Sequence, residues 1–363
     1  MTSAADSNSF PPKLSSRDRV LRYAHVFLWV ASVGAVALLC ATDILPQWLE
    51  KRSQPYLTFA AATFVVQTLK FHIGLACLAC VVYAAVRRRW RLTVVAGMAT
   101  MMAFAPALWG AITRDDVPAP AGATMRVMSM NVMLTNRNAD ALLETVRHAE
   151  PDVLVLQEYT RTIDEPLRKE LADEYPYQLR KPMENSDGWA VYSRRPLLAP
   201  IDTALQLGDS QRQARFAVRM GATEVIIYAL HLTCPKSIDQ IGANRAEVAD
   251  LVSRISTEGK PVILAGDFNF TDGTANANAL EGVGLRDAHD LAGSGRGSTW
   301  RYRALGFTHR LPGFRIDHIY MSDKLTCTSA QVLDTAGTDH RPIIADVAWA
   351  SQNPADKAVA SVE

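Results

Sequence analysis

The sequence predicts a two-sheet α/β sandwich that follows three transmembrane helices. Long apolar runs that contain almost no charge occupy the first third of the 363-residue chain, as membrane spans require. From Arg126 onward, short runs of branched apolar residues alternate with segments of helical periodicity. Several of these short runs end in Asn, Glu, His or Asp, which places polar side chains at one edge of a sheet.

The first apolar run, Tyr23–Thr42, has no charged residue apart from His25 and is long enough to cross a bilayer. A second span is expected over Val65–Val86, with residues 56–64 near the interface and Lys70 extending its ammonium group toward the head groups. The third is expected over Leu92–Thr113. A signal peptide is the alternative for the first run, but the two runs that follow favour a retained anchor.

Basic residues beside the spans predict the orientation. They precede the first span and separate the second from the third: Lys13, Arg17, Arg19, Arg22, Arg87, Arg88, Arg89 and Arg91. Both groups are expected in the cytoplasm, which puts everything after Thr113 outside it. This topology fits a multi-pass protein of a bacterial inner membrane with a periplasmic domain. A four-span count that splits at Lys70 would put the second basic group outside and is disfavoured.

These features divide the chain into five parts. We expect a cytoplasmic tail over residues 1–22, a membrane region over 23–113 and a linker over 114–124 that contains Pro118, Pro120 and Gly122. A globular catalytic domain is expected over 125–349, followed by a disordered tail over 350–363.

Composition excludes few classes of function. The formal net charge is +1, so the whole chain has no basic field for nucleic acid, although a local basic groove would suffice. The five cysteines have no paired zinc-ligand spacing. A disulfide between Cys234 and Cys327 is expected only if the domain lies outside the cytoplasm.

The elements of the globular part follow from residue patterns. Strands are expected where branched and aromatic residues cluster, over 126–132, 152–156, 189–192, 216–220, 224–232, 261–265, 315–321, 327–332 and 343–347. Helices are expected over 139–148, 165–175 and 238–255, the last with apolar residues on one face. Many strands with few covering helices favour two packed sheets over a simple doubly wound sheet.

Six polar clusters carry the chemistry, and each comes at or near the end of an apolar run. They contain Asn131, Gln157-Glu158, His231, Asp267 with Asn269, Asp317-His318, and Asp339-His340. They combine hard oxygen ligands with imidazoles and contain no thiolate, which suits Mg²⁺ or Mn²⁺ better than zinc. We expect His318 to face away from the site, because it follows Asp317 in a strand.

The order of these residues resembles the endonuclease/exonuclease/phosphatase superfamily, which includes deoxyribonuclease I, exonuclease III, sphingomyelinases and inositol phosphate phosphatases. The resemblance covers Met125–Val347, and its most specific pieces are Gln157-Glu158, Gly266–Asn269 and Asp339–Pro342. Thr338 replaces the family's usual serine and keeps its hydroxyl. The front end is similar to a membrane-anchored bacterial subgroup, and the resemblance implies a four-layered α/β/β/α sandwich.

The resemblance also implies roles for the metal site and the acid–base pair. Glu158 would be the principal ligand of Mg²⁺ or Mn²⁺, with Asn131 and Asp339 as further ligands. Asp267 would orient or deprotonate the attacking water. His340, held by Asp317, would donate to the phosphate or transfer a proton.

Four residues would contact the phosphate according to the same resemblance. Asn269 would hold water or a phosphate oxygen, and His231 would contact the phosphate from the other side. Asn131 would lie near the metal or the phosphate. Arg215 stands where the family sometimes has a basic residue, although a surface salt bridge is the alternative for it.

The prediction is therefore a membrane-embedded, metal-dependent phosphoesterase that needs no organic cofactor. Its phosphoester substrate is either nucleic acid or a phospholipid or other phosphodiester, since a tether to the membrane suits each of them. The alternative from another class is a membrane-bound binding or scaffold protein with a dead catalytic fold. Every expected polar position is filled, which favours the enzyme.

Overall fold

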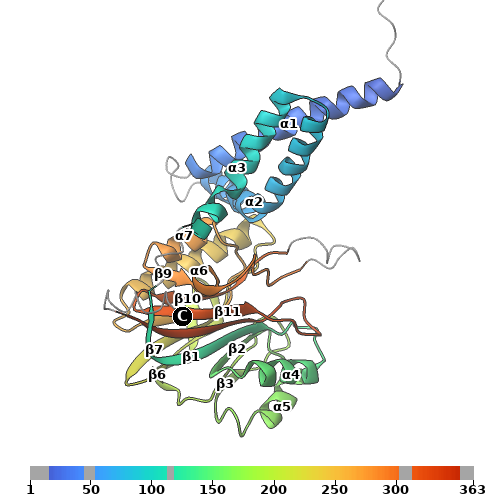
Figure 1. Ribbon diagram of the computed structural model, residues 1–363. Coiled ribbons are helices and arrows are strands. Elements are labelled where there is room, and N and C mark those ends of the chain that lie inside the picture. The colour runs from blue at the N-terminus through green and yellow to red at the C-terminus, as the bar shows by residue number, and fades with distance from the viewer. Residues whose placement is uncertain (1–15, 45–53, 113–117, 302–312, 352–363) are drawn as a thin grey trace, which may run out of the picture. The chain divides into compact units, whose positions relative to one another are not determined.

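The computed structural model describes residues 16–44, 54–112, 118–301 and 313–351 (Figure 1). The chain divides into two compact units, one made of residues 1–47 and 69–106 and the other of residues 48–68 and 107–363. Most of the two predicted tails, residues 1–22 and 350–363, lies outside the described residues.

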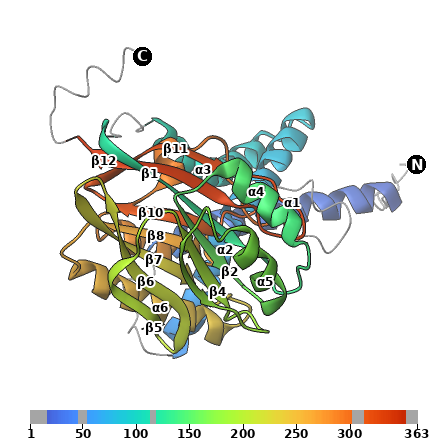
Figure 2. The ribbon, with the colours of Figure 1, turned by 90° about the horizontal axis from the view of Figure 1, so that it is seen from below.

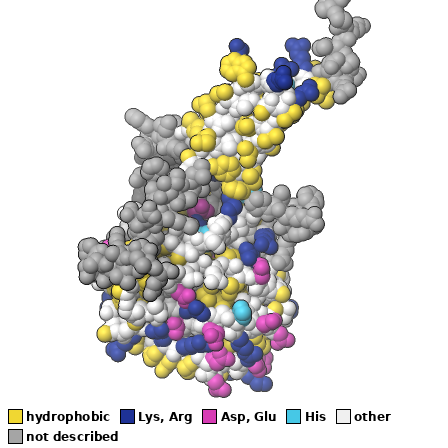
Figure 3. All heavy atoms as spheres, in the orientation of Figure 1, with side chains coloured by type: hydrophobic (Ala, Val, Ile, Leu, Met, Phe, Trp, Pro, Cys, Tyr) yellow, Lys and Arg dark blue, Asp and Glu magenta, His cyan; other side chains and the backbone are white. Residues whose placement is uncertain are grey.

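Three long helices form the N-terminal part of the chain: α1 (Ser16–Ile44), α2 (Gln54–Val86) and α3 (Trp90–Ile112). The segments Arg19–Ala41 and Thr58–Val86 are long and apolar enough to cross a membrane. Hydrophobic side chains cover much of the visible helical surface, and lysine and arginine side chains lie near its end (Figure 3). Such an apolar surface is rare on a protein that contacts only water.

Two candidate spans, rather than the predicted three, meet this test in the described residues. The third prediction, Leu92–Thr113, falls on α3, whose apolar described stretch Trp90–Ala105 is shorter. The second prediction placed residues 56–64 near the interface; in the structure α2 is one continuous helix from Gln54, and its candidate span begins at Thr58.

The globular part contains two six-stranded sheets in its described residues. In order across sheet A lie β11 (Leu325–Val332), β12 (Ile343–Ala350), β1 (Pro120–Asn131), β2 (Val153–Gln157), β4 (Trp189–Ser193) and β3 (Tyr177–Lys181). In order across sheet B lie β5 (Leu198–Leu207), β6 (Ser210–Met220), β7 (Thr223–His231), β8 (Val262–Asp267), β10 (Asp317–Ser322) and β9 (Leu285–Asp287).

Three hydrophobic clusters hold four layers together. The cluster between the sheets takes side chains from both, including Val127 and Val155 of sheet A and Ile227 and Ile263 of sheet B. On the outer face of sheet A pack α4 (Ala139–Ala149) and α5 (Arg161–Glu170), and on the outer face of sheet B packs α6 (Ile238–Ser256) (Figure 2). Helix α7 (Ala275–Glu281) joins the same cluster as α6. The two-sheet sandwich predicted from the sequence is therefore confirmed.

The elements that the sequence did not predict lie mostly at sheet edges. Strands β3, β5 and β9 are all edge strands. An edge strand is exposed along one side and β3 and β5 have mixed burial, so their sequences lack a strong apolar run. The short helices α7 and α8 (Ala288–Ala292) were also missed.

Several predicted boundaries shift in the structure, such as the start of β6, which lies at Ser210 and not at residue 216. Helix α5 begins at Arg161, earlier than the expected residue 165, and contains Pro166 within it. Strand β1 begins at Pro120, where it pairs with Ala350 of β12, so residues 120–124 belong to the sheet and not to the predicted linker.

Candidate active site

Strand register brings the predicted polar residues to one end of both sheets. In sheet A, the parallel strands β1 and β2 pair Asn131 with Gln157, so Glu158 follows directly beyond that edge. In sheet B, the parallel strands β7 and β8 pair His231 with Asp267, and the antiparallel β10 pairs Asp317 with Asp267. Three functional side chains therefore lie in a row across sheet B.

The row in sheet B requires a glycine next to Asp267. A Cβ atom on Gly266 would collide with the carbonyl of Leu230 on the neighbouring strand. Any other residue would push β7 and β8 apart at the point where they present His231 and Asp267. Gly266 is thus part of the positioning of the site.

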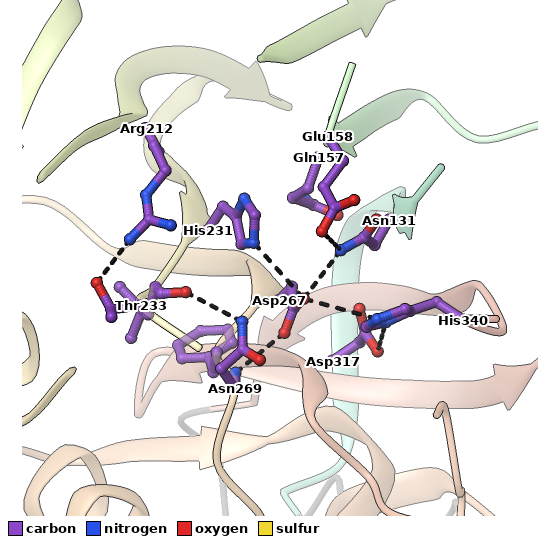
Figure 4. Close-up of polar contacts among 12 residues, drawn as sticks. Asn131, Gln157, Glu158, Arg212, His231, Thr233, Asp267, Asn269, Asp317 and His340 are labelled. Carbon is purple, nitrogen blue, oxygen red and sulfur yellow. Dashed lines mark hydrogen bonds and ion pairs between the residues drawn. The ribbon is translucent and has the colours of Figure 1, made fainter. Parts of the chain in front are cut away.

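Asn131 links the two sheets. Its Nδ2 donates to Asp267 Oδ2 at 3.0 Å and to Glu158 Oε1 at 3.3 Å (Figure 4). The backbone amide of Leu134 donates to Glu158 Oε2 at 2.7 Å. Glu158 has a φ of 55°, in the left-handed region that a non-glycine residue adopts at a cost of roughly 1–3 kcal/mol. That backbone conformation turns its carboxylate toward Asn131.

His340 and Asp317 form a buried acid–base pair. His340 Nδ1 and Asp317 Oδ2 lie 2.8 Å apart. The backbone amide of Asp317 donates to the hydroxyl of Thr299, and the backbone amide of His340 donates to the hydroxyl of Thr338. These hydrogen bonds fix the backbone of both residues. The Thr338 hydroxyl also donates to the carbonyl of Asn131. The hydroxyl of Thr338 therefore links the segment that carries His340 to the end of β1.

Charge within the cluster separates the protonation states of its members. Burial raises the pKa of Asp267 to about 7, and the neighbouring Asp317 carboxylate adds to that rise. Burial opposes the imidazolium of His340, but the Asp317 and Asp267 carboxylates outweigh it and raise the pKa of His340 to about 10. At neutral pH the site thus holds a protonated imidazole beside a carboxylate that exchanges its proton readily.

His231 lies on the other side of Asp267, with its Nε2 3.8 Å from Asp267 Oδ2. Burial lowers the pKa of His231 to about 3, and the Arg212 guanidinium and His340 add to that effect. His231 is therefore neutral. Arg212 Nη2 donates to Thr233 Oγ1 at 2.6 Å and also lies 3.3 Å from Glu247 Oε1, which holds its charge beside His231.

Asn269 completes the polar surround of Asp267. Its backbone amide donates to Asp267 Oδ1 at 3.0 Å, and its Nδ2 donates to the carbonyl of Leu232 at 3.0 Å. Like Glu158, Asn269 has a φ of 55°. Two strained residues at one site are typical of a functional centre.

The donor set fits a divalent cation. One ligand atom from each of Asp267, Asp317 and His340 lies within 4.8 Å of the other two. A protonated imidazole does not bind a metal, however, so the raised pKa of His340 argues against it as a ligand. The oxygens of Glu158 and Asn131, on the opposite side of Asp267, are hard donors suited to Mg²⁺ or Mn²⁺.

One carboxylate oxygen of the cluster lacks a hydrogen-bond partner within the described part of the chain. Asp317 Oδ1 is buried and has no hydrogen-bond partner among the described residues. Glu158, Asp267 and Asp317 supply three carboxylates to one site. A cation there would offset repulsion that the protein's own groups leave uncompensated.

One predicted site residue, Arg215, is not brought into this cluster, and another, Asp339, lies beside it. Arg215 points elsewhere: its Nη2 donates to Glu258 Oε2 at 2.6 Å and its Nε donates to the hydroxyl of Tyr228 at 3.2 Å. The prediction that it contacts phosphate was therefore wrong, because Glu258, which follows α6, accepts its hydrogen bonds instead. Asp339, a predicted metal ligand, accepts from the indole of Trp300 at 2.9 Å, and its charge adds to those that raise the pKa of the neighbouring His340.

His318 and the two cysteines are also accounted for. His318 faces away from the cluster as expected, with its Nδ1 2.7 Å from Asp287 Oδ2 and its Nε2 3.0 Å from the carbonyl of Phe270. Cys234 and Cys327 are free thiols, so the disulfide left open by the sequence is not formed.

Sequence reasoning missed Arg212, Thr299 and Glu247. Arg212 lies in β6 between two glutamines, and nothing in Gln-Arg-Gln distinguishes it from a surface residue. Its role depends on a carboxylate from α6 and a threonine after β7, which only the fold brings together.

Comparison with known proteins agrees with this fold. The model of the Endonuclease/Exonuclease/phosphatase family matches residues 128–340. No curated protein sequence matches the chain significantly. Among solved structures, an endonuclease/exonuclease/phosphatase from Beutenbergia cavernae is 19% identical with a TM-score of 0.50, over 63% of this chain and 72% of that one.

Two further structures have a similar fold. The 3′ phosphatase NExo from Neisseria, bound to a product DNA hairpin, is 20% identical with a TM-score of 0.50, over 62% of this chain and 100% of that one. A conserved protein of unknown function from Enterococcus faecalis is 18% identical with a TM-score of 0.51, over 62% of this chain and 100% of that one. At these identities the likeness shows the shared fold.

Proposed function

Because this chain belongs to the endonuclease/exonuclease/phosphatase family, we propose that it is a divalent-metal-dependent phosphoesterase that hydrolyses a P–O bond by in-line attack of water. One observation carries this proposal. A buried carboxylate with a pKa of about 7 and a buried imidazole with a pKa of about 10 face each other across 3.9 Å, Asp267 Oδ2 to His340 Nε2. That places a base and an acid next to each other at the site, where both can reach one substrate.

Asp267 is the base in this proposal. Asn131 and the backbone amide of Asn269 each donate to one of its oxygens, which fixes the carboxylate plane. A pKa of about 7 lets it accept a proton from water and release that proton in the next turnover. Its position at the end of β8 leaves the attacking water between it and the phosphorus.

His340 donates a proton or a charged hydrogen bond to the phosphate. Asp317 holds the Nδ1 side of the ring, so Nε2 remains to face the substrate. Removing one donor that stabilises the charge of the transition state costs ~10²–10³ in rate. Neutral His231 contacts the phosphate from the opposite side, and the positive charge of Arg212 lies behind His231.

Glu158 and Asn131 would hold the metal ion, which we propose is Mg²⁺ or Mn²⁺. When bound, such an ion neutralises charge on the phosphate and polarises the phosphorus toward attack. The chain's own contribution at that position is Glu158 Oε1 and Oε2, oriented by Asn131 and by the Leu134 amide.

The test uses the purified full chain in detergent, with Mg²⁺ and bis(p-nitrophenyl) phosphate as a generic phosphodiester. The wild type should release nitrophenol, and Asp267→Asn should lose at least ~10²-fold in kcat. Asp173→Asn is the matched control, because this exposed aspartate lies away from the described site. A wild type that hydrolyses no phosphoester, or an Asp267→Asn variant as active as the wild type, would contradict the proposal.

The membrane part is proposed as three spans that hold the catalytic domain outside the cytoplasm. The exposed apolar surface of α1 and α2 supports insertion, with Phe27 70% and Val82 59% exposed. Helix α3 has 23 residues, enough for ~35 Å at 1.5 Å per residue. The exposed arginines at 87–89 between α2 and α3 favour the cytoplasm. A C-terminal alkaline phosphatase fusion should be active in a bacterial host, whereas a fluorescent C-terminal GFP fusion would contradict this topology.

A further inference from the structure

A second histidine–aspartate pair lies behind the catalytic cluster. His318 follows Asp317 on β10, and successive residues of a strand point to opposite faces, so its side chain lies on the outer face of sheet B. That side chain is fully buried. Its Nδ1 lies 2.7 Å from Asp287 Oδ2, and its Nε2 lies 3.0 Å from the carbonyl oxygen of Phe270. The proposed mechanism uses neither contact.

Both ring nitrogens of His318 donate a hydrogen bond. The carbonyl oxygen of Phe270 can only accept, so Nε2 carries a proton. Burial favours the neutral form of Asp287, but Arg315 and His318 outweigh it and lower the pKa of that carboxyl group. Asp287 is therefore ionised, and its Oδ2 can only accept from Nδ1. The ring thus bridges Asp287, at the start of α8, to the backbone of Phe270.

Aromatic side chains fix the orientation of this bridge. The ring of His318 is stacked with the rings of Phe270 and Tyr320, at centroid distances of 5.7 and 5.4 Å. Phe268 packs against it edge-on, with its centroid 5.6 Å away. All three aromatic residues are themselves buried. A ring enclosed in this way keeps its Nε2 directed at the carbonyl of Phe270.

Phe270 ends the short segment that carries two functional residues. Directly before it, Asn269 has a φ of 55°, a strained conformation that persists only where the surrounding structure holds it. The backbone amide of Asn269 donates to Asp267 Oδ1, and its side chain donates to the carbonyl of Leu232. The hydrogen bond from His318 to the next carbonyl holds the segment at its other end. Without that bond, relaxation of Asn269 would turn its amide away from Asp267.

We propose that His318 is a positioning residue for hydrolysis: through the Phe270 carbonyl it holds the strained segment that orients Asp267. This inference rests on the proposed function, in which Asp267 is the base. The two contacts of His318 have different consequences. The ion pair with Asp287 stabilises the fold, whereas the hydrogen bond to Phe270 also fixes the catalytic carboxylate.

Two substitutions of His318 separate its contacts. The side-chain amide nitrogen of glutamine reaches the position of Nε2, whereas that of asparagine reaches only the position of Nδ1. His318→Gln therefore keeps a donor for Phe270, and His318→Asn keeps one for Asp287. The assay uses the full chain in detergent with Mg²⁺ and bis(p-nitrophenyl) phosphate. His318→Asn should lose at least ~10-fold in kcat with little change in KM, because the base is displaced while the other phosphate contacts remain. His318→Gln should be at least ~10-fold faster than His318→Asn.

A control tests whether lost stability alone explains the result. Asp287→Asn breaks the ion pair at the other end of the bridge, and a neutral imidazole can still carry its proton on Nε2. We expect this variant to unfold at a lower denaturant concentration than the wild type and to keep the wild-type kcat. His318→Phe keeps a stacked ring and removes both donors, so it should lose kcat as His318→Asn does. It takes the place of His318→Asn if that variant fails to fold.

Hydrogen exchange measures the same contact without a substrate. In the peptide that spans residues 266–272, mass spectrometry should show faster exchange in His318→Asn than in the wild type and in His318→Gln. Equal exchange in the three proteins, or equal kcat in the two His318 variants, would overturn the inference while leaving the phosphoesterase intact. A loss of kcat in Asp287→Asn as large as in His318→Asn would overturn it as well. A wild type that hydrolyses no phosphodiester would instead refute the proposed function, and hydrogen exchange would then decide whether His318 holds the segment.

Discussion

Replacing Asp317 with Asn removes one negative charge beside His340 and keeps an oxygen that can accept from Nδ1. The rise in the pKa of His340 from 6.5 to about 10 corresponds to roughly 5 kcal/mol in favour of the imidazolium. Asp317 and Asp267 share that energy, and Asp317 is closer, at 2.8 Å against 3.9 Å. We therefore expect the variant to lose at least half of it, which brings the pKa of His340 to about 8 or lower.

The pH profile of hydrolysis measures this change. His340 acts while protonated, so activity falls as the pH rises through its pKa. In the wild type the alkaline limb of kcat/KM should lie near pH 10, and in Asp317→Asn it should move to about pH 8. At neutral pH we expect a loss of ~10²-fold in kcat from the weaker donor. An alkaline limb that stays in place, with Asp173→Asn as the control, would refute the pairing of Asp317 with His340.

Three further predictions follow from other parts of the structure. Glu158→Gln should weaken Mg²⁺ binding by at least tenfold in titration calorimetry, because it removes the charged donor. His318→Gln should lower the free energy of unfolding by about 3 kcal/mol, since it breaks a buried pair with Asp287. Burial opposes the charged form of His318, but Asp287 outweighs it and raises the pKa, so this stabilisation is full below about pH 6.5 and declines as the pH rises through the raised value. Arg215→Gln should leave hydrolysis unchanged and lower stability by about 1 kcal/mol, because Arg215 pairs with Glu258.

Controls separate these effects from general damage. Glu144→Gln alters an exposed residue of α4 and should bind Mg²⁺ like the wild type. Denaturation at about pH 6 and about pH 9 should show the His318→Gln deficit shrinking at the higher pH; a deficit that grows with pH would contradict the assigned sign. A large loss of hydrolysis in Arg215→Gln would restore that residue to the site.

The sequence predicted most of the catalytic cluster because its residues stand where apolar strands end. Asn131, Glu158, His231 and Asp267 each follow such a run, and parallel strands end together at one edge. The Asp317–His340 pair could be predicted as well, since the family resemblance implies that Asp317 holds His340. These residues come together only if the two sheets pack face to face with the same ends aligned. The hydrogen bond from Asn131 of sheet A to Asp267 of sheet B shows that they do.

What the sequence did not predict depends on contacts between distant segments. Arg212 and Arg215 are three residues apart on β6, and only their partners distinguish them. Arg212 forms an ion pair with Glu247 of α6 and lies near His231, whereas Arg215 forms an ion pair with Glu258, which follows α6, and points away from the site. The edge strands β3 and β5 were missed for a related reason, because exposed edges do not need an apolar pattern.

Hydrolysis in water enriched in oxygen-18 tests the central claim most directly. The claim is that water, activated at Asp267, attacks phosphorus while His340 donates to the phosphate. The wild-type chain with Mg²⁺ and bis(p-nitrophenyl) phosphate should yield a phosphate product that carries the label and a nitrophenol that does not, and Asp267→Asn should form that labelled product at least ~10²-fold more slowly. Label in the nitrophenol, or equal rates of labelling in the two proteins, would contradict the account.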